Sequence, residues 1–175
     1  MQHIPGVDMS SGSLGQGISA AVGMALSAKI RGNDYRTCTL LGVGEIEEGL
    51  VWEASMFASA KKLDNVCVIV DNNNLQIDGT IDEVNSPYPI DEKFKAFGFH
   101  VINVNGHDFD ELRAAFAEAK TVKGQPTVII MKTVKGKGVS FMENNAAWHG
   151  SAPNDEQYAV AMADLEKVGE ALCQK

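Results

Sequence analysis

The sequence predicts an α/β domain built on a doubly wound parallel sheet with helices on both faces. Stretches with the apolar spacing of a strand alternate along the chain with stretches that have helical spacing. The apolar run over residues 66–70 does not alternate with polar residues, so both faces of that strand are expected to be covered. The 175 residues are enough for one domain around one core, and residues 1–175 are interpreted as a single domain.

The first half of the chain is predicted to form a helix, a strand, a second helix and a second strand. Apolar residues recur at helical spacing over residues 17–31, and a short apolar run follows at 37–42. Spacing of three to four predicts the next helix over 50–61, in which Trp52 and Phe57 are interpreted as core residues. The buried strand then covers residues 66–71.

The second half repeats the alternation. Strands are predicted over residues 100–105 and 127–134, and helices over 109–120 and 155–173. Asp108, followed three residues later by Glu111, predicts a capping box for the helix at 109. Two connections, over residues 72–89 and 134–152, are longer than the usual two to six residues of a βα loop, and long loops tend to carry function.

Composition excludes several classes of protein. The net charge of −8 argues against a nucleic-acid or anionic-membrane surface, which would need clustered Lys and Arg. No apolar stretch approaches the roughly 20 residues of a membrane span, and the first residues lack the pattern of a signal peptide. Cys38, Cys67 and Cys173 are odd in number and lie in two predicted strands and a terminal helix, which favours a reducing cytoplasm over a disulfide framework or a zinc site.

Three polar, glycine-rich segments are expected to meet at the carboxyl ends of the strands, at residues 12–17, 42–45 and 71–79. Glycines let backbone N–H groups approach a phosphate, and Gly44 precedes a helix predicted to begin near Glu48. Taken alone, such a segment is more consistent with a tight turn than with a phosphate site. The side chain of Asn73 and a backbone carbonyl of its loop are oxygen donors of the kind that bind a magnesium ion holding a diphosphate.

These segments resemble thiamine-diphosphate enzymes, whose shared motif begins GDG and ends in one or two asparagines; this chain has GVGE, then NNN at 72–74. Six segments are similar to a transketolase, specifically the N-terminal subunit of the split, two-gene type: GSLGQGISAAVGMA, EEGLVWEA, DNNNLQIDG, VNGHDF, KTVKGKGVSFMEN and WHGSAP. The resemblance covers nearly the whole chain. It implies the thiamine-diphosphate-binding fold, of which residues 1–175 would form the diphosphate-binding domain.

The resemblance also implies which residues bind the cofactor. Gly12 and Leu14 match residues that line the aminopyrimidine pocket, although Leu14 also fits a plain core residue. Gly44 matches a glycine whose backbone contacts the diphosphate. Asn73 matches the metal ligand that binds through its side chain, and Leu75 the ligand that binds through its carbonyl.

The same resemblance gives two candidate catalytic residues, His149 and Glu48. His149 matches a histidine that contacts the cofactor near the reacting carbon, and a surface-loop role is its alternative. Glu48 matches a glutamate at the interface with the partner domain. His100 and His107 have no partner at metal-ligand spacing and are interpreted as structural.

Two departures from the family pattern change the expectation. The metal-binding aspartate of the family is Val43 here, and valine has no lone pair to offer a cation. Weak or absent binding of thiamine diphosphate and magnesium is therefore expected, unless water or a repositioned Glu45 fills the place. The family's N-terminal helical segment, which supplies histidines near the phosphates, is expected to be missing, and its absence to leave apolar surface on the sheet and first helix.

The family transfers a two-carbon ketol unit between ketose and aldose phosphates. It takes the glutamate that activates the aminopyrimidine from a pyrimidine-binding domain, so the expected partner is a C-terminal transketolase subunit in a homo- or hetero-oligomer. Two alternatives stay open: a catalytically inactive homologue with an assembly or interaction role, and another thiamine enzyme such as a deoxyxylulose-phosphate synthase or a ketoacid dehydrogenase component. Lys135 and Lys137 fit either a contact to substrate phosphate or a solvated loop.

Overall fold

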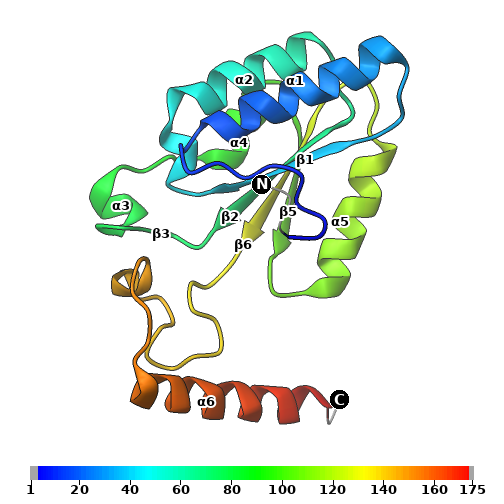
Figure 1. The fold of residues 1–175 in the computed structure, drawn as a ribbon. Coiled ribbons are helices and arrows are strands. Elements are labelled where there is room, and N and C mark those ends of the chain that lie inside the picture. The colour runs from blue at the N-terminus through cyan, green and yellow to red at the C-terminus, as the bar shows by residue number, and fades with distance from the viewer. Residues whose placement is uncertain (1–3, 174–175) are drawn as a thin grey trace.

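The computed structural model describes residues 4–173 and contains a four-stranded sheet in which every pairing is parallel (Figure 1). The strands, in the order β1-β2-β6-β5 across the sheet, are β1 (Thr37–Gly42), β2 (Val66–Asn72), β6 (Thr127–Lys132) and β5 (His100–Asn105). The predicted parallel α/β fold is confirmed. The last strand ends at Lys132, two residues before the predicted end.

The register aligns the carboxyl ends of the strands at one edge of the sheet. Gly42 of β1 lies opposite Asp71 of β2, and Lys132 of β6 lies opposite both Asn72 of β2 and Asn105 of β5. Loops that leave this edge therefore begin side by side, which is where open parallel sheets bind ligands.

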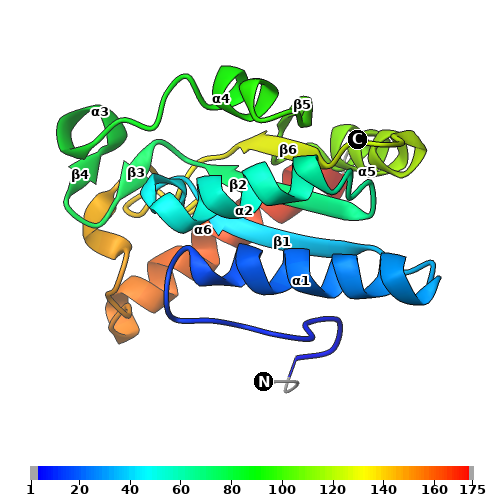
Figure 2. The same cartoon turned by 90° about the horizontal axis from the view of Figure 1, so that it is seen from above.

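Helices cover both faces of the sheet, as predicted. One face is covered by α1 (Gln16–Arg31), α2 (Gly49–Ala60) and α4 (Ile90–Ala96), and the other by α5 (Phe109–Thr121). Figures 1 and 2 show α1 and α2 together on one side of the strands and α5 apart from them. The larger core lies under α1, α2 and α4, and its members alternate along the strands with those of the smaller core under α5.

The aromatic side chains of the second helix divide between core and surface. The Trp52 ring lies 5.0 Å from the Phe94 ring and 5.2 Å from the Phe97 ring, measured between centroids, so its predicted packing role is confirmed. The prediction for Phe57 is wrong. Phe57 is 42% exposed, because it falls on the outer side of α2, where Lys61 lies over its ring.

The capping box predicted for α5 forms only in part. Asp108 caps the helix by accepting hydrogen bonds from the backbone N–H groups of Asp110 and Glu111. Glu111 does not return a bond to Asp108. Its carboxylate instead accepts from the backbone N–H of Asn105 at 2.7 Å, at the end of β5, so the acid ties the helix to the strand edge.

The long connections contain short elements that apolar periodicity did not predict. The first carries a two-stranded hairpin and a helical turn with a complete capping box between Thr80 and Glu83, and α4 follows it. Two 3-10 turns also occur, one between β1 and α2 and one in the second long connection. The additional elements are η1 (Glu45–Glu47), β3 (Leu75–Gln76), β4 (Gly79–Thr80), α3 (Ile81–Val84) and η2 (Ala146–Trp148).

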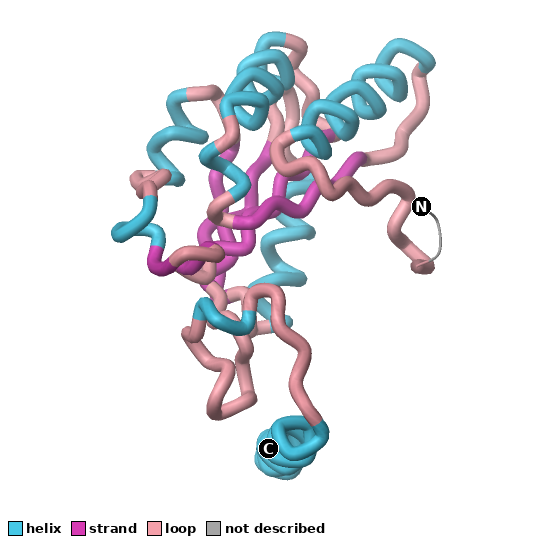
Figure 3. Tube along the Cα trace, turned by 60° about the vertical axis from the view of Figure 1, so that its left-hand side comes forward, coloured by secondary structure: helices cyan, strands magenta, loops and turns pink. Residues whose placement is uncertain are grey.

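The last helix, α6 (Asp155–Cys173), lies apart from the sheet, beyond the carboxyl ends of the strands (Figures 1 and 3). Ala161 is its one buried residue within the part of the chain that the structure describes. Contact with the preceding loop comes from Asp164, which accepts from the Ser140 backbone at 2.9 Å and from the Ser140 hydroxyl at 2.6 Å. Over residues 4–173, no helix combines the length and apolarity that a membrane crossing requires.

Candidate functional site

The loops that follow β1 and β2 lie side by side at the carboxyl edge of the sheet, as the sequence predicted. The backbone N–H of Val43 donates to the carbonyl of Asp71 at 3.1 Å, so the strand pairing continues one residue into the loops. Gly44 faces the second loop so closely that a Cβ atom there would lie 3.3 Å from Cβ of Gln76. Glycine at 44 therefore keeps its backbone accessible between the two loops.

Glu47 joins the two loops. Its carboxylate accepts a hydrogen bond from the Gln76 amide at 2.8 Å and one from the Asn85 amide at 2.9 Å. Sequence reasoning missed this residue, because nothing in the run EIEE distinguishes Glu47 from Glu48 until the second loop folds against it. Glu48, the candidate interface residue, is exposed at the start of α2.

Glu45 holds the glycine-rich entry segment against the end of β1. One carboxylate oxygen accepts from the backbone N–H of Gly15 at 3.0 Å, and the other accepts from that of Gly42 at 3.1 Å. Gly15 has φ of 79°, and a Cβ there would lie 2.7 Å from Cβ of Glu48, so only glycine fits. Because both oxygens of Glu45 are engaged, moving it toward a metal ion would break two hydrogen bonds.

Val43 is part of the hydrophobic core. Its side chain is 1% exposed and belongs to the cluster between the sheet and the α1–α2 layer, together with Leu41 and Ile46. The position that the sequence resemblance matches to a metal-binding aspartate is therefore filled by methyl groups within apolar packing.

Asn73 and Asp71 form a local hydrogen-bond network in the second loop. The Asn73 amide oxygen accepts from the backbone N–H of Leu75 at 3.0 Å, and its amide nitrogen donates to one carboxylate oxygen of Asp71 at 3.3 Å. The other carboxylate oxygen of Asp71 accepts from the hydroxyl of Thr133, beyond the end of β6. Sequence reasoning missed Asp71 and Thr133, which are 62 residues apart and meet only through the strand order.

These groups do not complete a magnesium site. Mg²⁺ requires near-ideal octahedral oxygen coordination and usually takes one or two carboxylates. The side-chain oxygens of Asn73, Asp71 and Glu45 all accept hydrogen bonds from other groups of the chain, and position 43 offers none. Across residues 4–173, no group of three His, Cys, Asp or Glu side chains is placed to hold a metal ion.

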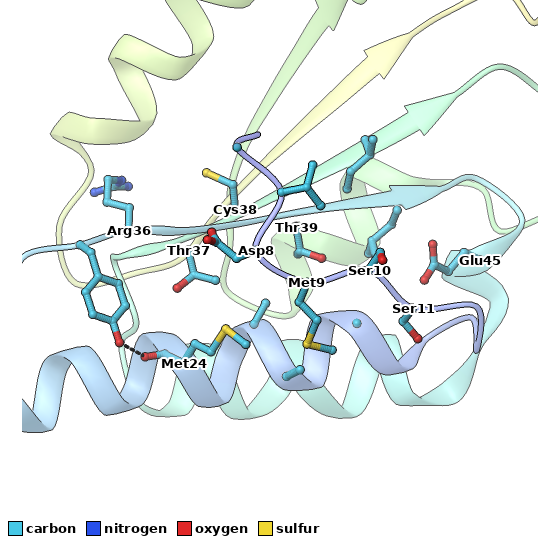
Figure 4. A pocket seen from close by; sticks show the side chains of 18 of the residues that line it. Asp8, Met9, Ser10, Ser11, Met24, Arg36, Thr37, Cys38, Thr39 and Glu45 are labelled. Carbon is cyan, nitrogen blue, oxygen red and sulfur yellow. Dashed lines mark hydrogen bonds between the residues drawn. The ribbon is translucent and has the colours of Figure 1, made fainter. Parts of the chain in front are cut away.

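Leu14 and Gly12 lie in the entry segment before α1. Leu14 is 57% exposed, so the alternative of a core residue is wrong for it. It lines a groove of about 650 Å³ together with Glu45, residues 6–11 and β1. Figure 4 shows this groove, with the segment from Asp8 to Ser11 passing over β1 and α1. Gly12 is exposed next to it, with open space where a Cβ would stand.

His149 lies in the connection after β6, at the end of η2, and is exposed. Its Nδ1 atom is 3.4 Å from the Lys135 ammonium. Figures 1 and 3 both place η2 beside the β3–β4 hairpin, which contains Leu75. His107 and His100 have structural partners, as interpreted: His107 accepts from the backbone N–H of Val134, and His100 pairs with Glu118.

Comparison with known proteins identifies relatives across nearly the whole chain. The family described as transketolase, thiamine diphosphate binding domain, matches residues 1–166. A 6-deoxy-6-sulfo-D-fructose transketolase subunit of Clostridium sp. strain MSTE9 is 44% identical over 169 residues, which are 97% of this chain and 62% of that protein. An apulose-4-phosphate transketolase subunit of Phocaeicola vulgatus is 40% identical over 170 residues, covering 97% of this chain and 60% of the relative.

Full-length transketolases match over a smaller share of their length. Human transketolase is 46% identical over 147 residues, which are 82% of this chain and 23% of the human protein. The crystal structure of transketolase from Campylobacter jejuni superposes with a TM-score of 0.85 at 34% sequence identity, covering 90% of this chain and 26% of that one. The chain thus spans less than two thirds of the two subunit relatives and about a quarter of the full-length enzymes.

Proposed function

The chain belongs to the family of transketolase thiamine-diphosphate-binding domains, and we propose that it is the cofactor-binding component of a two-subunit transketolase. Support comes from the two relatives of which the chain covers 62% and 60%, since both are named as transketolase subunits. The observation that carries the proposal is the pair of loops after β1 and β2, which meet at the edge where parallel sheets bind ligands.

The proposed activity is transfer of a two-carbon ketol unit between ketose and aldose phosphates. The cofactor, when bound, supplies the electron sink for this chemistry, and the chain's residues hold and orient it. The backbone at Gly44 would contact the diphosphate, Leu14 would line the aminopyrimidine pocket, and His149 would lie near the reacting carbon. A C-terminal, pyrimidine-binding subunit would complete the site across an interface that includes Glu48, in a homo- or hetero-oligomer.

The metal site is proposed to be impaired. Asn73 and the carbonyl of Leu75 remain as neutral oxygen donors, but position 43 contributes no charge. Loss of one charged partner from a desolvated cluster costs about 3–5 kcal/mol, which corresponds to about a hundredfold to a few thousandfold in affinity. The engagement of Glu45 with Gly15 and Gly42 supports this, because the acid that would have to replace the missing ligand is already bonded.

A second candidate function is that of an inactive transketolase-like homologue with an assembly or interaction role. Burial of Val43 in the core favours it, since this packing stabilises the fold without any ligand. The proposed compartment in either case is the cytoplasm, because Cys38, Cys67 and Cys173 are all free thiols.

Reconstitution separates the two functions. The chain would be mixed with a C-terminal transketolase subunit, and ketol transfer between sugar phosphates measured at micromolar thiamine diphosphate with magnesium. A Val43→Asp variant is expected to be at least about tenfold more active than the unmodified chain. Asparagine has the shape of aspartate but no charge, so Val43→Asn should increase the activity less. If neither variant gains activity although both bind the partner subunit, the assembly role is the better account.

A further inference from the structure

Two of the three cysteines lie side by side in the sheet, away from the loop pair. Cys38 of β1 and Cys67 of β2 are direct partners in the parallel register. Neighbouring strands are about 4.8 Å apart, which falls within the roughly 4.4–6.8 Å that separate the Cα atoms of disulfide-bonded cysteines. Partners in a ladder also point to the same face of the sheet, so the two sulfur atoms are on the α5 side.

The two thiols differ in access to solvent. Cys67 is 2% exposed and packs with Ala115 and Ala119 under α5. Cys38 is exposed, because β1 is the edge strand and α5 does not extend over it. It lines the groove of about 650 Å³ beneath the N-terminal segment, which is wide enough for a small reagent to enter. Figure 4 shows the Cys38 sulfur and the Arg36 side chain rising from the same side of β1.

The surroundings of Cys38 favour a thiolate. The pKa of Cys38 is lowered to about 6, mainly by a hydrogen bond from the Cys67 thiol and further by the positive charges of Arg36 and Lys120, while partial burial opposes the shift. Arg36 is fixed next to the sulfur, since its guanidinium donates to the carbonyl of Ala119 at 2.8 Å. Two acidic groups also line the groove, Asp8 from the segment across it and Glu45 beyond the end of β1.

The pKa of Cys67 is raised, first by its hydrogen bond to Cys38, then by burial and by the Cys38 charge. Cys67 therefore stays a protonated thiol as long as Cys38 is a thiolate. An exposed thiolate near a cation, with a buried second thiol as its partner on the neighbouring strand, is the arrangement of a reactive cysteine with a resolving cysteine.

We propose that Cys38 and Cys67 form a hydroperoxide-reactive dithiol, in which Cys38 is oxidised first and Cys67 then closes a disulfide between β1 and β2. This site is independent of the proposed cofactor chemistry, because it lies at the amino-terminal half of β1 and uses none of the loop residues.

The chemistry balances with a hydroperoxide as the oxidant. The Cys38 thiolate attacks the terminal peroxide oxygen, a sulfur–oxygen bond forms and the oxygen–oxygen bond breaks. The departing alkoxide or hydroxide takes a proton from solvent, leaving a sulfenic acid on Cys38. Oxidation removes the negative charge of Cys38, which is one of the causes that raise the pKa of Cys67. The Cys67 sulfur then displaces the hydroxyl of the sulfenic acid, and its proton leaves with that hydroxyl as water.

The first test is the alkylation rate of Cys38 in a Cys173→Ser background, with iodoacetamide over a range of pH. The alkylation rate is expected to level off above about pH 7. At pH 6 it should be roughly tenfold higher than the rate of the same cysteine in the urea-unfolded chain. This ratio allows for the lower nucleophilicity of a thiolate with a low pKa. Arg36→Gln should lower the rate at pH 6, and Arg36→Lys should largely restore it. A rate that keeps rising to pH 9 would overturn the proposal.

The second test is oxidation of the same protein with hydrogen peroxide, followed by peptide mass spectrometry. The expected product is a linked pair of peptides containing Cys38 and Cys67, lighter by two hydrogens than the reduced pair. Cys67→Ser, with Cys67→Ala as a second variant should the hydroxyl disturb the core, is expected to leave a Cys38 sulfenic acid that dimedone traps. If peroxide produces neither the linked pair nor the trapped adduct, Cys38 is an ordinary edge-strand thiol.

Discussion

The residue that follows β1 is Val43, at the position where a metal-binding carboxylate was expected from the sequence resemblance. Val43 is buried with Leu41 and Ile46 in the core. Its backbone nevertheless keeps the contact with Asp71 that aligns the two loops. Valine at position 43 therefore removes one proposed metal ligand but leaves the two loops aligned.

Glu45 is the residue on which the entry segment depends. Replacing it with Ala removes two charge-assisted hydrogen bonds, to Gly15 and Gly42, and is expected to lower the free energy of unfolding by about 2 kcal/mol. Urea denaturation followed by circular dichroism measures this. Glu53→Ala, at an exposed position of α2, is the matched control and should change stability by less than about 0.5 kcal/mol. Equal effects of the two substitutions would show that the hydrogen bonds of Glu45 to Gly15 and Gly42 do not stabilise the fold.

At the scale of elements, the long strands and helices were predictable because each has a strong apolar period that burial enforces. The bounds of α1, α2, α5 and α6 lie within one residue of the predicted ranges. The hairpin β3–β4 and the helices α3 and α4 were missed, because elements of two to seven residues are too short to show an apolar period. Phe57 was misplaced for a related reason, since helical spacing alone does not say which side of α2 faces the core.

The junction between β5 and β6 depends on a glycine. A Cβ atom at Gly106 would lie 2.4 Å from Cγ2 of Thr133 and 3.0 Å from Cβ of Met131. Gly106→Ala is therefore expected to destabilise the fold by about 2 kcal/mol through overpacking. The measurement is the midpoint of urea unfolding.

The matched control for that substitution is Gly23→Ala in the middle of α1, where no atom lies within 4 Å of the added methyl group. It should stabilise the protein by about 0.5–1 kcal/mol, because alanine loses less backbone entropy in a helix. Opposite signs for the two glycines are the expected result. Stabilisation by Gly106→Ala would contradict the close approach of the two strand ends.

The attachment of α6 to its loop is expected to depend on pH. The pKa of Asp164 is lowered, mainly by the Ser140 hydroxyl and then by the Ser140 backbone N–H. Because the folded-state pKa lies below the ordinary value, the contact contributes fully above that ordinary value of 3.8 and is lost as the pH falls through the lowered pKa.

Asp164→Asn imitates the protonated state at neutral pH. Residues 136–145 should then exchange their amide hydrogens faster at pH 7 than in the unmodified chain, as read by mass spectrometry. Asp155→Asn, in the first turn of the same helix, is the control and should leave that segment unchanged. Unaltered exchange in both variants would show that α6 is held by other contacts.

At the scale of the whole molecule, the meeting of the loops could be predicted while much of their chemistry could not. Parallel strands bring their carboxyl ends to one edge, so segments 42–45 and 71–79 had to lie close together. The bridging role of Glu47 and the contact between Asp71 and Thr133 depend on side-chain directions that no spacing encodes.

Exposed apolar side chains suit a chain that works in an assembly. On α6, exposed positions include Tyr158, Leu165 and Leu172, and on the sheet and first helix Leu40 and Ile30 are exposed. The proposed C-terminal subunit would account for part of this surface, since the two subunit relatives described above carry that word in their names.

Calorimetric titration of the chain with thiamine diphosphate, in magnesium and again in EDTA, tests the central claim most directly. The unmodified chain is expected not to saturate at micromolar cofactor, and its affinity should change little with magnesium. The Val43→Asp variant, once circular dichroism shows that it is folded, should bind the cofactor at least about a hundredfold more tightly with magnesium than without. Micromolar, magnesium-dependent binding by the unmodified chain would contradict the account.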